Sequence, residues 1–326
     1  MAKYSIVKFK NMSPLHVGAG RDTYDTAAQF LQSDTVSAAL ASIYAQQGGD
    51  DVLGFMNGFT VSSAFPYSGG KYFLPKPLGR LQFAGCDVDR VRKMVKKVRY
   101  VDLEIWQELV AGKVLDLNEQ QLKAEFLVPK GEMDDFAKPY TMAVQQRVAV
   151  PRGGSGDAEP FFFEWKYFTK DAGLFCLFQA DEKHEQLVKE LFVRLGENGI
   201  GSDRSVGGGM FDVEFDTIDL PEVNDANAMM LLSQYIPTED ELKQISLEDS
   251  CYELVQRGGY MSGSDHAGFR HLIKQSVYMF NTASVLKTPH SPVGRIVDLT
   301  PSWNGEEMHP VYRSGRSLAL PIKITD

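Results

Sequence analysis

Residues 199–211 read GIGSDRSVGGGMF, with five glycines, two serines and one arginine between an amphipathic segment and an alternating one. Glycine lacks a Cβ and tolerates positive φ, so such a loop can bring backbone N–H groups against an anion. Arg204 adds a charge, and Ser202 and Ser205 add hydroxyls. A phosphate fits this chemistry. The alternative is a long helix-to-strand connection whose glycines only satisfy turn geometry.

The segments around this loop predict an α+β fold. Apolar residues at helical spacing favour a helix over Glu182–Glu197, and residues 173–180 and 210–216 are typical of strands. A first strand begins near Tyr4, and Ser33 or Asp34 is expected to cap the next helix. These elements form a split βαβ unit, which is the ferredoxin-like pattern. Because the glycine loop follows a helix and precedes a strand, it is neither a Rossmann fingerprint nor a P-loop.

Composition predicts a globular protein with no membrane segment. The chain has 326 residues, 43% of them hydrophobic, and a formal net charge of −9. This charge argues against a surface that coats nucleic acid everywhere, although a local basic groove is compatible with it. The cysteines at 86, 176 and 251 are far apart, which suggests neither a disulfide framework nor a zinc knuckle. We expect a cytoplasmic protein without a signal peptide.

The sequence contains no pattern typical of an active site. Its six histidines lack the spacing that places two metal ligands on one helical face, and no nucleophile elbow is present. We therefore expect no metal, no cofactor and no catalytic residue. The alternative is metal-independent RNA cleavage, with His16 as general base and Arg204 or Lys76 stabilising the phosphorane.

A second glycine-containing segment, SPLHVGAGR at residues 13–21, follows the first predicted strand. Gly18 and Gly20 would let the backbone approach a ligand that His16 and Arg21 can reach. The alternative is a plain strand-to-helix connection. Further along, Lys76 lies between Pro75 and Pro77, which restrict its backbone.

Two other basic segments are candidate contacts for a polyanion. Residues 90–99 combine six basic side chains with one apolar face, which predicts an amphipathic helix that either binds an anionic partner or is simply solvated. Residues 145–164 predict a protruding hairpin, in which Arg147 and Arg152 could grip phosphates. The alternative for that hairpin is a disordered surface loop.

The composition changes after residue 212, because residues 212–255 carry twelve acidic side chains and a single lysine, Lys243. This part would repel a nucleic-acid backbone. We expect one ferredoxin-like domain over 1–220 and a second over 221–326. The second has strands near 228–235, 252–260 and 277–286, and a helix capped by Thr238 and Glu241. Arg313 and Arg316 near the end either contact RNA or flank a hairpin.

The chain resembles a known family in four segments taken in order. They are SPLHVGAG at 13–20, SDTVSAAL at 33–40, SAFPY at 63–67 with YFLPKP at 72–77, and the loop at 199–209. This set resembles the RAMP-superfamily subunit four of the type III-A CRISPR Csm effector complex. The resemblance implies two ferredoxin-like domains and a non-catalytic subunit that holds the 5′ repeat-derived handle of crRNA. It also implies contacts with the large Cas-ten-type polymerase/cyclase subunit and the adjacent backbone RAMP subunit.

The resemblance also implies a set of RNA contacts. The hairpin, about residues 140–165, would be a thumb that props a base out of the guide. The loop would depart from the family pattern at Asp203, which repels phosphate unless it points away. The equivalent subunit of a type III-B or III-D complex is the alternative identity. The implied contacts are His16, Gly18, Gly20, Arg21, Lys76, Arg147, Arg152, Gly201, Arg204, Ser205, Gly207 and Gly208.

Overall fold

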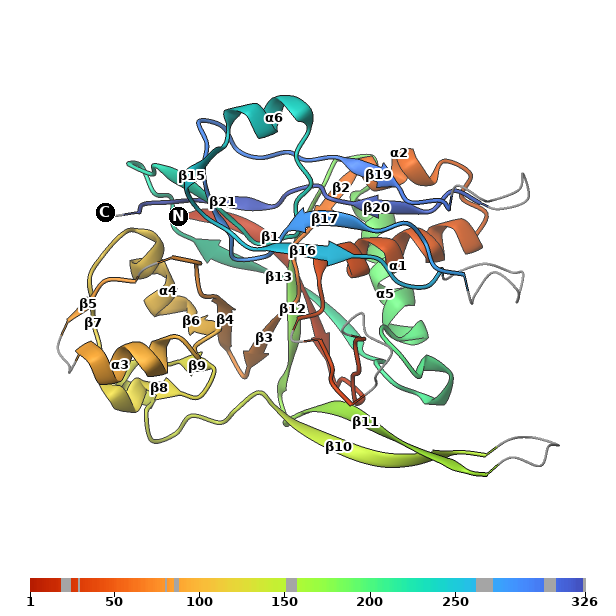
Figure 1. Cartoon of the computed structure of the whole chain (residues 1–326), viewed down its shortest axis with the longest axis horizontal. Helices are drawn as coiled ribbons and strands as arrows, with labels where there is room; N and C mark the ends of the chain where they lie inside the picture. Colours follow the sequence, from red (N-terminus) through yellow and green to blue (C-terminus); the bar gives the residue numbers. More distant parts are fainter. Residues whose placement is uncertain are drawn as a thin grey trace.

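The computed structural model describes residues 1–18, 25–28, 30–79, 81–84, 88–150, 157–261, 272–301 and 309–324. The predicted contacts Gly20, Arg21 and Arg152 lie outside these ranges. Figure 1 shows a central sheet with helices at one side, an insertion at the left, a long hairpin below and the C-terminal strands above. No helix within the described ranges is long and apolar enough to cross a membrane.

The N-terminal half of the chain builds a ferredoxin-like unit. Its strands run in the order β13-β1-β12-β3, with β2 also paired to β12, and all these pairs are antiparallel. Numbered within the unit, this is the order 4-1-3-2 with a helix after the first and third strands, so the predicted fold class is confirmed. The elements are β1 (Ala2–Lys10), α1 (Ser33–Gln46), α2 (Val52–Asn57), β2 (Phe59–Val61), β3 (Phe65–Ser68), β12 (Ala172–Ala180), α5 (Glu185–Asn198) and β13 (Asp212–Leu220).

Both faces of this sheet are covered, because successive side chains of a strand point to opposite faces. In β1, Val7 and Phe9 pack with α1 and α5 in one core cluster. Ile6, which directly precedes Val7, packs in another cluster that includes C-terminal residues such as Met230 and Leu320. The helices and the C-terminal half therefore cover opposite faces of β1.

The first helix begins differently from the prediction. Its N-cap is Gln32, which makes no side-chain capping bond, and Ser33 and Asp34 lie inside the first turn. Their side chains are buried and bind other parts of the fold. Residues that usually cap helices are here taken by tertiary contacts, which the local pattern cannot reveal.

An insertion between β3 and the hairpin extends the central sheet through β4, β6, β9 and β8. The basic helix is shorter than predicted: it ends at Val95, and the buried Val98 lies in the segment that follows it. Its apolar face is buried as expected, with Val91 and Val95 in the core. The elements are β4 (Lys71–Pro75), β5 (Phe83–Ala84), α3 (Val88–Val95), β6 (Tyr100–Asp102), α4 (Leu103–Val110), β7 (Leu115–Asp116), η1 (Glu119–Gln121), β8 (Leu122–Lys123), β9 (Phe126–Leu127) and η2 (Lys130–Glu132).

The predicted hairpin is confirmed and extends away from the body in Figure 1. It consists of β10 (Tyr140–Ala149) and β11 (Glu159–Phe168), paired antiparallel over their whole length. These strands form a two-stranded sheet of their own. We call this hairpin the thumb.

The C-terminal half repeats the strand order of the first. Its four-stranded antiparallel sheet runs β15-β18-β14-β21, with α6 after the first strand in sequence. The capping box of Thr238 and Glu241 is confirmed. The expected strand at 277–286 is instead two strands, β17 and β18, which belong to different sheets. The domain boundary at 221 stays a prediction. The elements are β14 (Ala228–Leu231), α6 (Glu239–Gln244), β15 (Ser246–Cys251), β16 (Leu254–Arg257), β17 (Val277–Phe280), β18 (Val285–Lys287), β19 (Ile296–Asp298), β20 (Tyr312–Ser314) and β21 (Ala319–Ile322).

A buried ion cluster joins the two halves. The Asp34 carboxylate is fully buried and accepts two hydrogen bonds from Arg257, at 3.0 and 3.1 Å, and another from Arg313. The Ser33 hydroxyl beside it accepts from the Gln234 amide at 2.8 Å. Arg313 is itself buried and pairs with Asp34, a contact that neither of its predicted roles, RNA contact or flanking a hairpin, included.

We expect Asp34→Asn to destabilise the fold by roughly 3–5 kcal/mol, because it leaves two largely buried guanidinium groups without their counter-charge. The control is Asp240→Asn, whose carboxylate is 86% exposed and pairs only with Lys243. That change should cost less than about 1 kcal/mol. Urea unfolding followed by circular dichroism measures both, and equal losses in the two variants would contradict the proposed role of Asp34.

Candidate nucleic-acid interface

The two glycine-containing segments predicted from the sequence lie against each other. The Ser202 amide donates to the His16 carbonyl at 2.9 Å, and the Gly209 amide donates to the Pro14 carbonyl at 2.9 Å. At the end of the loop, the Met210 amide donates to the Ser13 hydroxyl at 2.8 Å. The segment after β1 therefore supports the loop between α5 and β13.

Gly201 is required for this close approach: it has φ +91°, and a Cβ placed there would lie 2.3 Å from the His16 carbonyl oxygen. Gly209 is required within the loop itself, because at its φ of +67° a Cβ would lie 1.8 Å from the Ile200 carbonyl oxygen. A larger residue at 201 would push the loop away from its support, and one at 209 would force the two ends of the loop apart.

Backbone hydrogen bonds made by the loop change the expectation that its glycine amides hold an anion. The amides of Gly207, Gly208 and Gly209 all donate to backbone carbonyls, of Arg204, Asp203 and Pro14. These N–H groups are used inside the fold, so the glycines shape the loop instead of presenting donors. Arg204 and Ser205, in contrast, are exposed at the tip, in the short η3 (Arg204–Val206).

The thumb rests on the same support through aromatic side chains. Phe163 and Trp165 of β11 are buried, and their ring centroids lie 4.3 and 6.5 Å from that of His16. His16 is fully buried, and its Nδ1 lies 2.7 Å from the Glu164 carbonyl, a distance at which Nδ1–H donates. The loop contributes as well, because a Cβ on Gly208 would meet the Trp165 ring at 3.0 Å.

Arg147 connects the thumb to the glycine loop. Its guanidinium lies 4.6 Å from the Phe163 ring centroid and 5.4 Å from that of Trp165, and it pairs with the Asp203 carboxylate. Asp203 has φ +59°, a left-handed conformation that aims it at the thumb. The acidic residue that departs from the family pattern is thus paired with a thumb arginine.

The structure brings together only part of the predicted contact set. His16, Arg147, Gly201, Arg204, Ser205, Gly207 and Gly208 belong to one region around the loop and the base of the thumb, and Gly18 follows His16 in the supporting segment. Lys76 lies elsewhere, with its Nζ 2.8 Å from the Val95 carbonyl in the insertion. The role of each as an RNA contact stays a prediction.

The sequence interpretation missed Lys166, which lies at the base of the thumb. Its backbone pairs with that of Leu15 through bonds of 3.0 and 2.9 Å, and its ammonium lies 4.3 Å from the Tyr140 ring centroid. Burial lowers the pKa of Lys166 to about 8, because desolvation disfavours the charged form. Alternation places Lys166 on the face of β11 opposite to the buried Phe163 and Trp165, so the sequence pattern could not reveal its burial.

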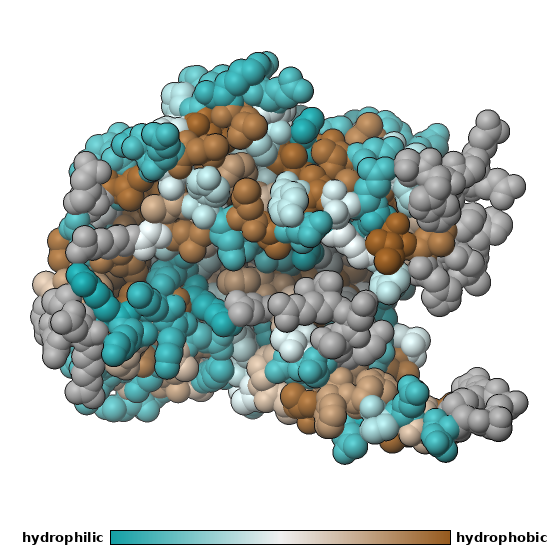
Figure 2. Space-filling model, in the orientation of Figure 1, coloured by the Kyte–Doolittle hydropathy of each residue, from teal (hydrophilic) through white to brown (hydrophobic). Residues whose placement is uncertain are grey.

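The thumb also presents apolar side chains to solvent. Met142, Val144, Val148 and Phe162 are between 38% and 55% exposed. Figure 2 shows the brown atoms that they contribute along the arm below the body. Phe162 is the aromatic member of this set, and an aromatic ring is the kind of side chain on which a base stacks.

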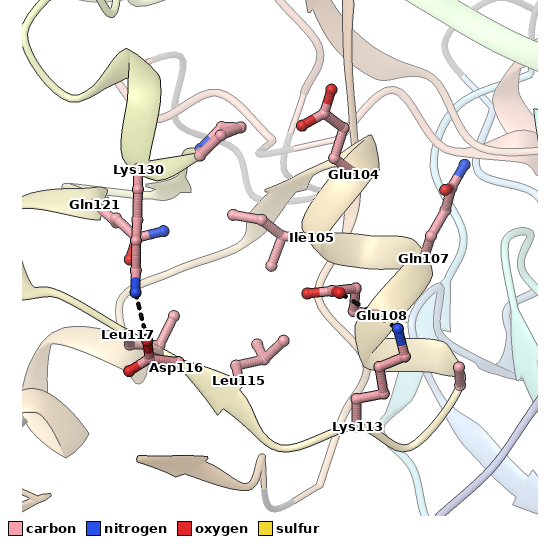
Figure 3. A pocket seen from close by; sticks show the side chains of 12 residues that line it. Glu104, Ile105, Gln107, Glu108, Lys113, Leu115, Asp116, Leu117, Gln121 and Lys130 are labelled. Atoms are coloured by element: carbon pink, nitrogen blue, oxygen red, sulfur yellow. Dashed lines mark hydrogen bonds and ion pairs between the residues drawn. The ribbon is translucent and has the colours of Figure 1, made fainter. Parts of the chain in front are cut away.

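A hollow in the insertion is a weaker site candidate. It has a volume of about 570 Å³ between α4 and the segment after β7. In Figure 3 two of its lysines point at carboxylates: Lys130 lies 2.5 Å from Asp116, and Lys113 lies 3.3 Å from Glu108. Its charges are largely paired within the protein. The described residues contain no cluster of side chains suited to a metal.

Comparison with known proteins gives matches over most of the chain. The profile of the CRISPR Csm4 C-terminal domain matches residues 224–322. A protein of Mycobacterium tuberculosis (strain CDC 1551 / Oshkosh), CRISPR system Cms protein Csm4, is 29% identical over 305 residues, 90% of this chain and 92% of the relative. The protein of the same name from Streptococcus thermophilus is 26% identical over 314 residues, 92% of each chain.

Two solved structures share the fold. A Csm3–Csm4 subcomplex of the type III-A CRISPR-Cas interference complex contains a chain with a TM-score of 0.65 and 17% identity, over 99% of this chain and 100% of that one. A Csm1–Csm4 cassette in complex with cA4 contains one with a TM-score of 0.63 and 19% identity, over the whole of both.

The ferredoxin-like order and the projecting thumb belong to a chain that shares the overall fold of the chains matched in these two structures. The matched C-terminal domain and the two relatives all carry the name Csm4. This chain is similar to Csm4 proteins over most of its length.

We expect Gly201→Ala to detach the loop from its support, because the added Cβ overlaps the His16 carbonyl. Its matched control is Gly207→Ala: Gly207 also has positive φ, +86°, but a Cβ there meets nothing within 4 Å. Strain alone should cost about 1–2 kcal/mol, and overlap at 201 roughly 1–3 kcal/mol more. Hydrogen exchange over residues 199–209 measures this. Equal protection in both variants would show that the contact with His16 does not hold the loop.

We expect the stability of the fold to depend on Lys166 at alkaline pH. The folded chain releases this proton near pH 8 and the unfolded chain near pH 10.5, so the unfolded state binds more protons between them. The free energy of unfolding should therefore rise across that window, by at most about 3 kcal/mol. Lys166→Met should remove the rise. Denaturation curves at pH 7.5 and pH 10.5 check this, and an unchanged difference in the variant would contradict it.

Proposed function

We propose that this chain is a non-catalytic RNA-binding subunit of a type III-A CRISPR-Cas interference complex. Its RNA ligand is the 5′ repeat-derived handle of crRNA. The handle lies against the loop at 199–209 and the thumb, and the thumb props one base out of the guide. The observation that carries this proposal is the exposed Arg204 and Ser205 beside the aromatic and arginine-bearing face of the thumb.

The chemistry of this surface suits single-stranded RNA. Phosphates are held by arginine and hydroxyl groups, and bases stack on aromatic side chains. Arg204 and Ser205 supply the first kind of group. Phe162, on the thumb face opposite to Phe163 and Trp165, is an exposed ring of the second kind. Arg147 is already paired with Asp203, so in this proposal it orients the thumb relative to the loop and meets phosphate only at its open side.

The protein partners are inferred from the two similar structures. The two structures of similar fold are complexes of Csm4 with Csm3 and of Csm4 with Csm1. We extend both contacts to this chain, which then joins the large polymerase/cyclase-type subunit to the backbone subunits. A complex of this kind works in the cytoplasm, and target RNA meets this subunit only indirectly. The III-B or III-D equivalent remains the alternative identity.

The arrangement of His16 favours binding over catalysis. A general base must reach the proton that it removes, whereas His16 is fully buried, donates to the Glu164 carbonyl and lies against Phe163. In this position its role is to support the thumb and the loop. No observation in the structure favours the endoribonuclease alternative.

We expect Arg204→Ala to weaken binding of a handle RNA and to lower the slope of log K against log salt by roughly 0.7–1, because one phosphate contact is lost. Arg194→Ala is the matched control: it is an exposed arginine of α5, paired with Glu197 and outside the loop. Fluorescence anisotropy with the handle and with a scrambled RNA of equal length measures both. Equal slopes for the two variants, or equal affinity for both RNAs, would overturn the proposal.

A further inference from the structure

A second, larger groove lies between the insertion and the C-terminal sheet, away from the glycine loop and the thumb. Its volume is about 1250 Å³. Its walls come from the segment after β4, from α3 and β7, and from β15, β18 and the end of β21. In Figure 1 these elements meet at the left, where the insertion lies below β15 and β21.

The groove is basic in an acidic protein. Six basic side chains line it against two acidic ones, Glu248 and Asp249, whereas the whole chain carries −9. Two of the six, Lys113 and Lys323, pair with carboxylates outside the groove. Within the part of the chain that the structure describes, Arg92, Lys96 and Lys287 form no ion pair, so these three cations are available to an anionic ligand.

Burial of the Lys76 ammonium makes one wall of the groove more attractive to an anion. Lys76 donates to the Val95 carbonyl at 2.8 Å, and desolvation lowers its pKa. A negative group placed beside this ammonium would compensate for the water that it has lost. The prolines on both sides, Pro75 and Pro77, restrict the backbone at this position.

The rest of the lining indicates which anion fits. It is mainly aliphatic, including Leu78, Leu81 and Ile324, which pack on the core beneath, and Phe83 is its single aromatic residue. Single-stranded nucleic acid is held mostly by stacking on aromatic rings. Aliphatic walls with fixed cations match instead a chain with carboxylates and aliphatic side chains. The volume also exceeds that of most small-molecule sites.

We propose that this groove binds an extended acidic and aliphatic peptide segment of a protein partner. The carboxylates of the segment meet Arg92, Lys96 and Lys76, and its apolar side chains lie on Leu78, Leu81 and Ile324. This surface is distinct from the proposed RNA surface, because no residue of the thumb or of the glycine loop lines it.

Cys251 provides a direct reporter of occupancy. It lines the groove as an exposed free thiol, and its Sγ would lie 3.1 Å from a Cβ on Gly79 across the wall. A segment bound in the groove covers this thiol and slows its alkylation. Cys176 is fully buried, and digestion into peptides separates its signal from that of Cys251.

The test uses the full chain and a labelled 12-residue peptide that alternates glutamate with leucine. A matched peptide has glutamine in place of glutamate, and a 12-nucleotide oligouridylate represents nucleic acid. We expect the acidic peptide to bind at least tenfold more tightly than the glutamine peptide and to slow iodoacetamide labelling of Cys251.

The double variant Arg92→Ser, Lys96→Ser should lose at least tenfold in affinity for the acidic peptide. The control double variant Lys93→Ser, Lys97→Ser changes the same charge on exposed neighbours that do not line the groove, and should stay within twofold. Equal loss in both variants, absence of peptide binding, or protection of Cys251 by oligouridylate but not by peptide would each overturn the proposal. RNA binding through Arg204 is unaffected by any of these outcomes.

Discussion

The fold depends on the buried carboxylate of Asp34. It lies in the first turn of α1, a helix of the N-terminal half, and it accepts hydrogen bonds from Arg257 and Arg313 of the C-terminal half. A buried charge is stable only when it is paired and hydrogen-bonded. The cluster therefore defines how the two halves sit together, and with them the C-terminal sheet that covers one face of β1.

The glycines of the loop at 199–209 determine its shape. Gly201 allows the loop to touch the segment after β1, Gly209 allows the two ends of the loop to meet, and the amides of Gly207 and Gly208 are used in internal bonds. What the loop presents to solvent is the side chain of Arg204 with Ser205. The thumb is positioned against it by rings packed on His16 and by the pair between Arg147 and Asp203. Binding groups on separate elements are thereby held on one rigid base.

The charge of the chain is divided between surfaces, not spread evenly. A net charge of −9 keeps most of the surface unattractive to RNA, and the proposed RNA surface is confined to the loop and thumb. The groove under β15 and β21 holds a separate group of cations, with a mainly aliphatic lining. Basic regions can exist on an acidic protein, because exposed charges are screened beyond about 8 Å in physiological salt.

Local patterns in the sequence determined the ferredoxin-like order, the thumb, the capping box at Thr238 and the candidate loop, since periodicity and turn chemistry act over a few residues. Only the tertiary structure decided the use of Ser33 and Asp34, which were expected to cap α1 and instead bind Gln234 and Arg257, some 200 residues away. It also paired Asp203 with Arg147, 56 residues apart, and placed Lys76 in another groove. Such contacts join residues distant in sequence, and their energies depend on burial, which no short window of sequence contains.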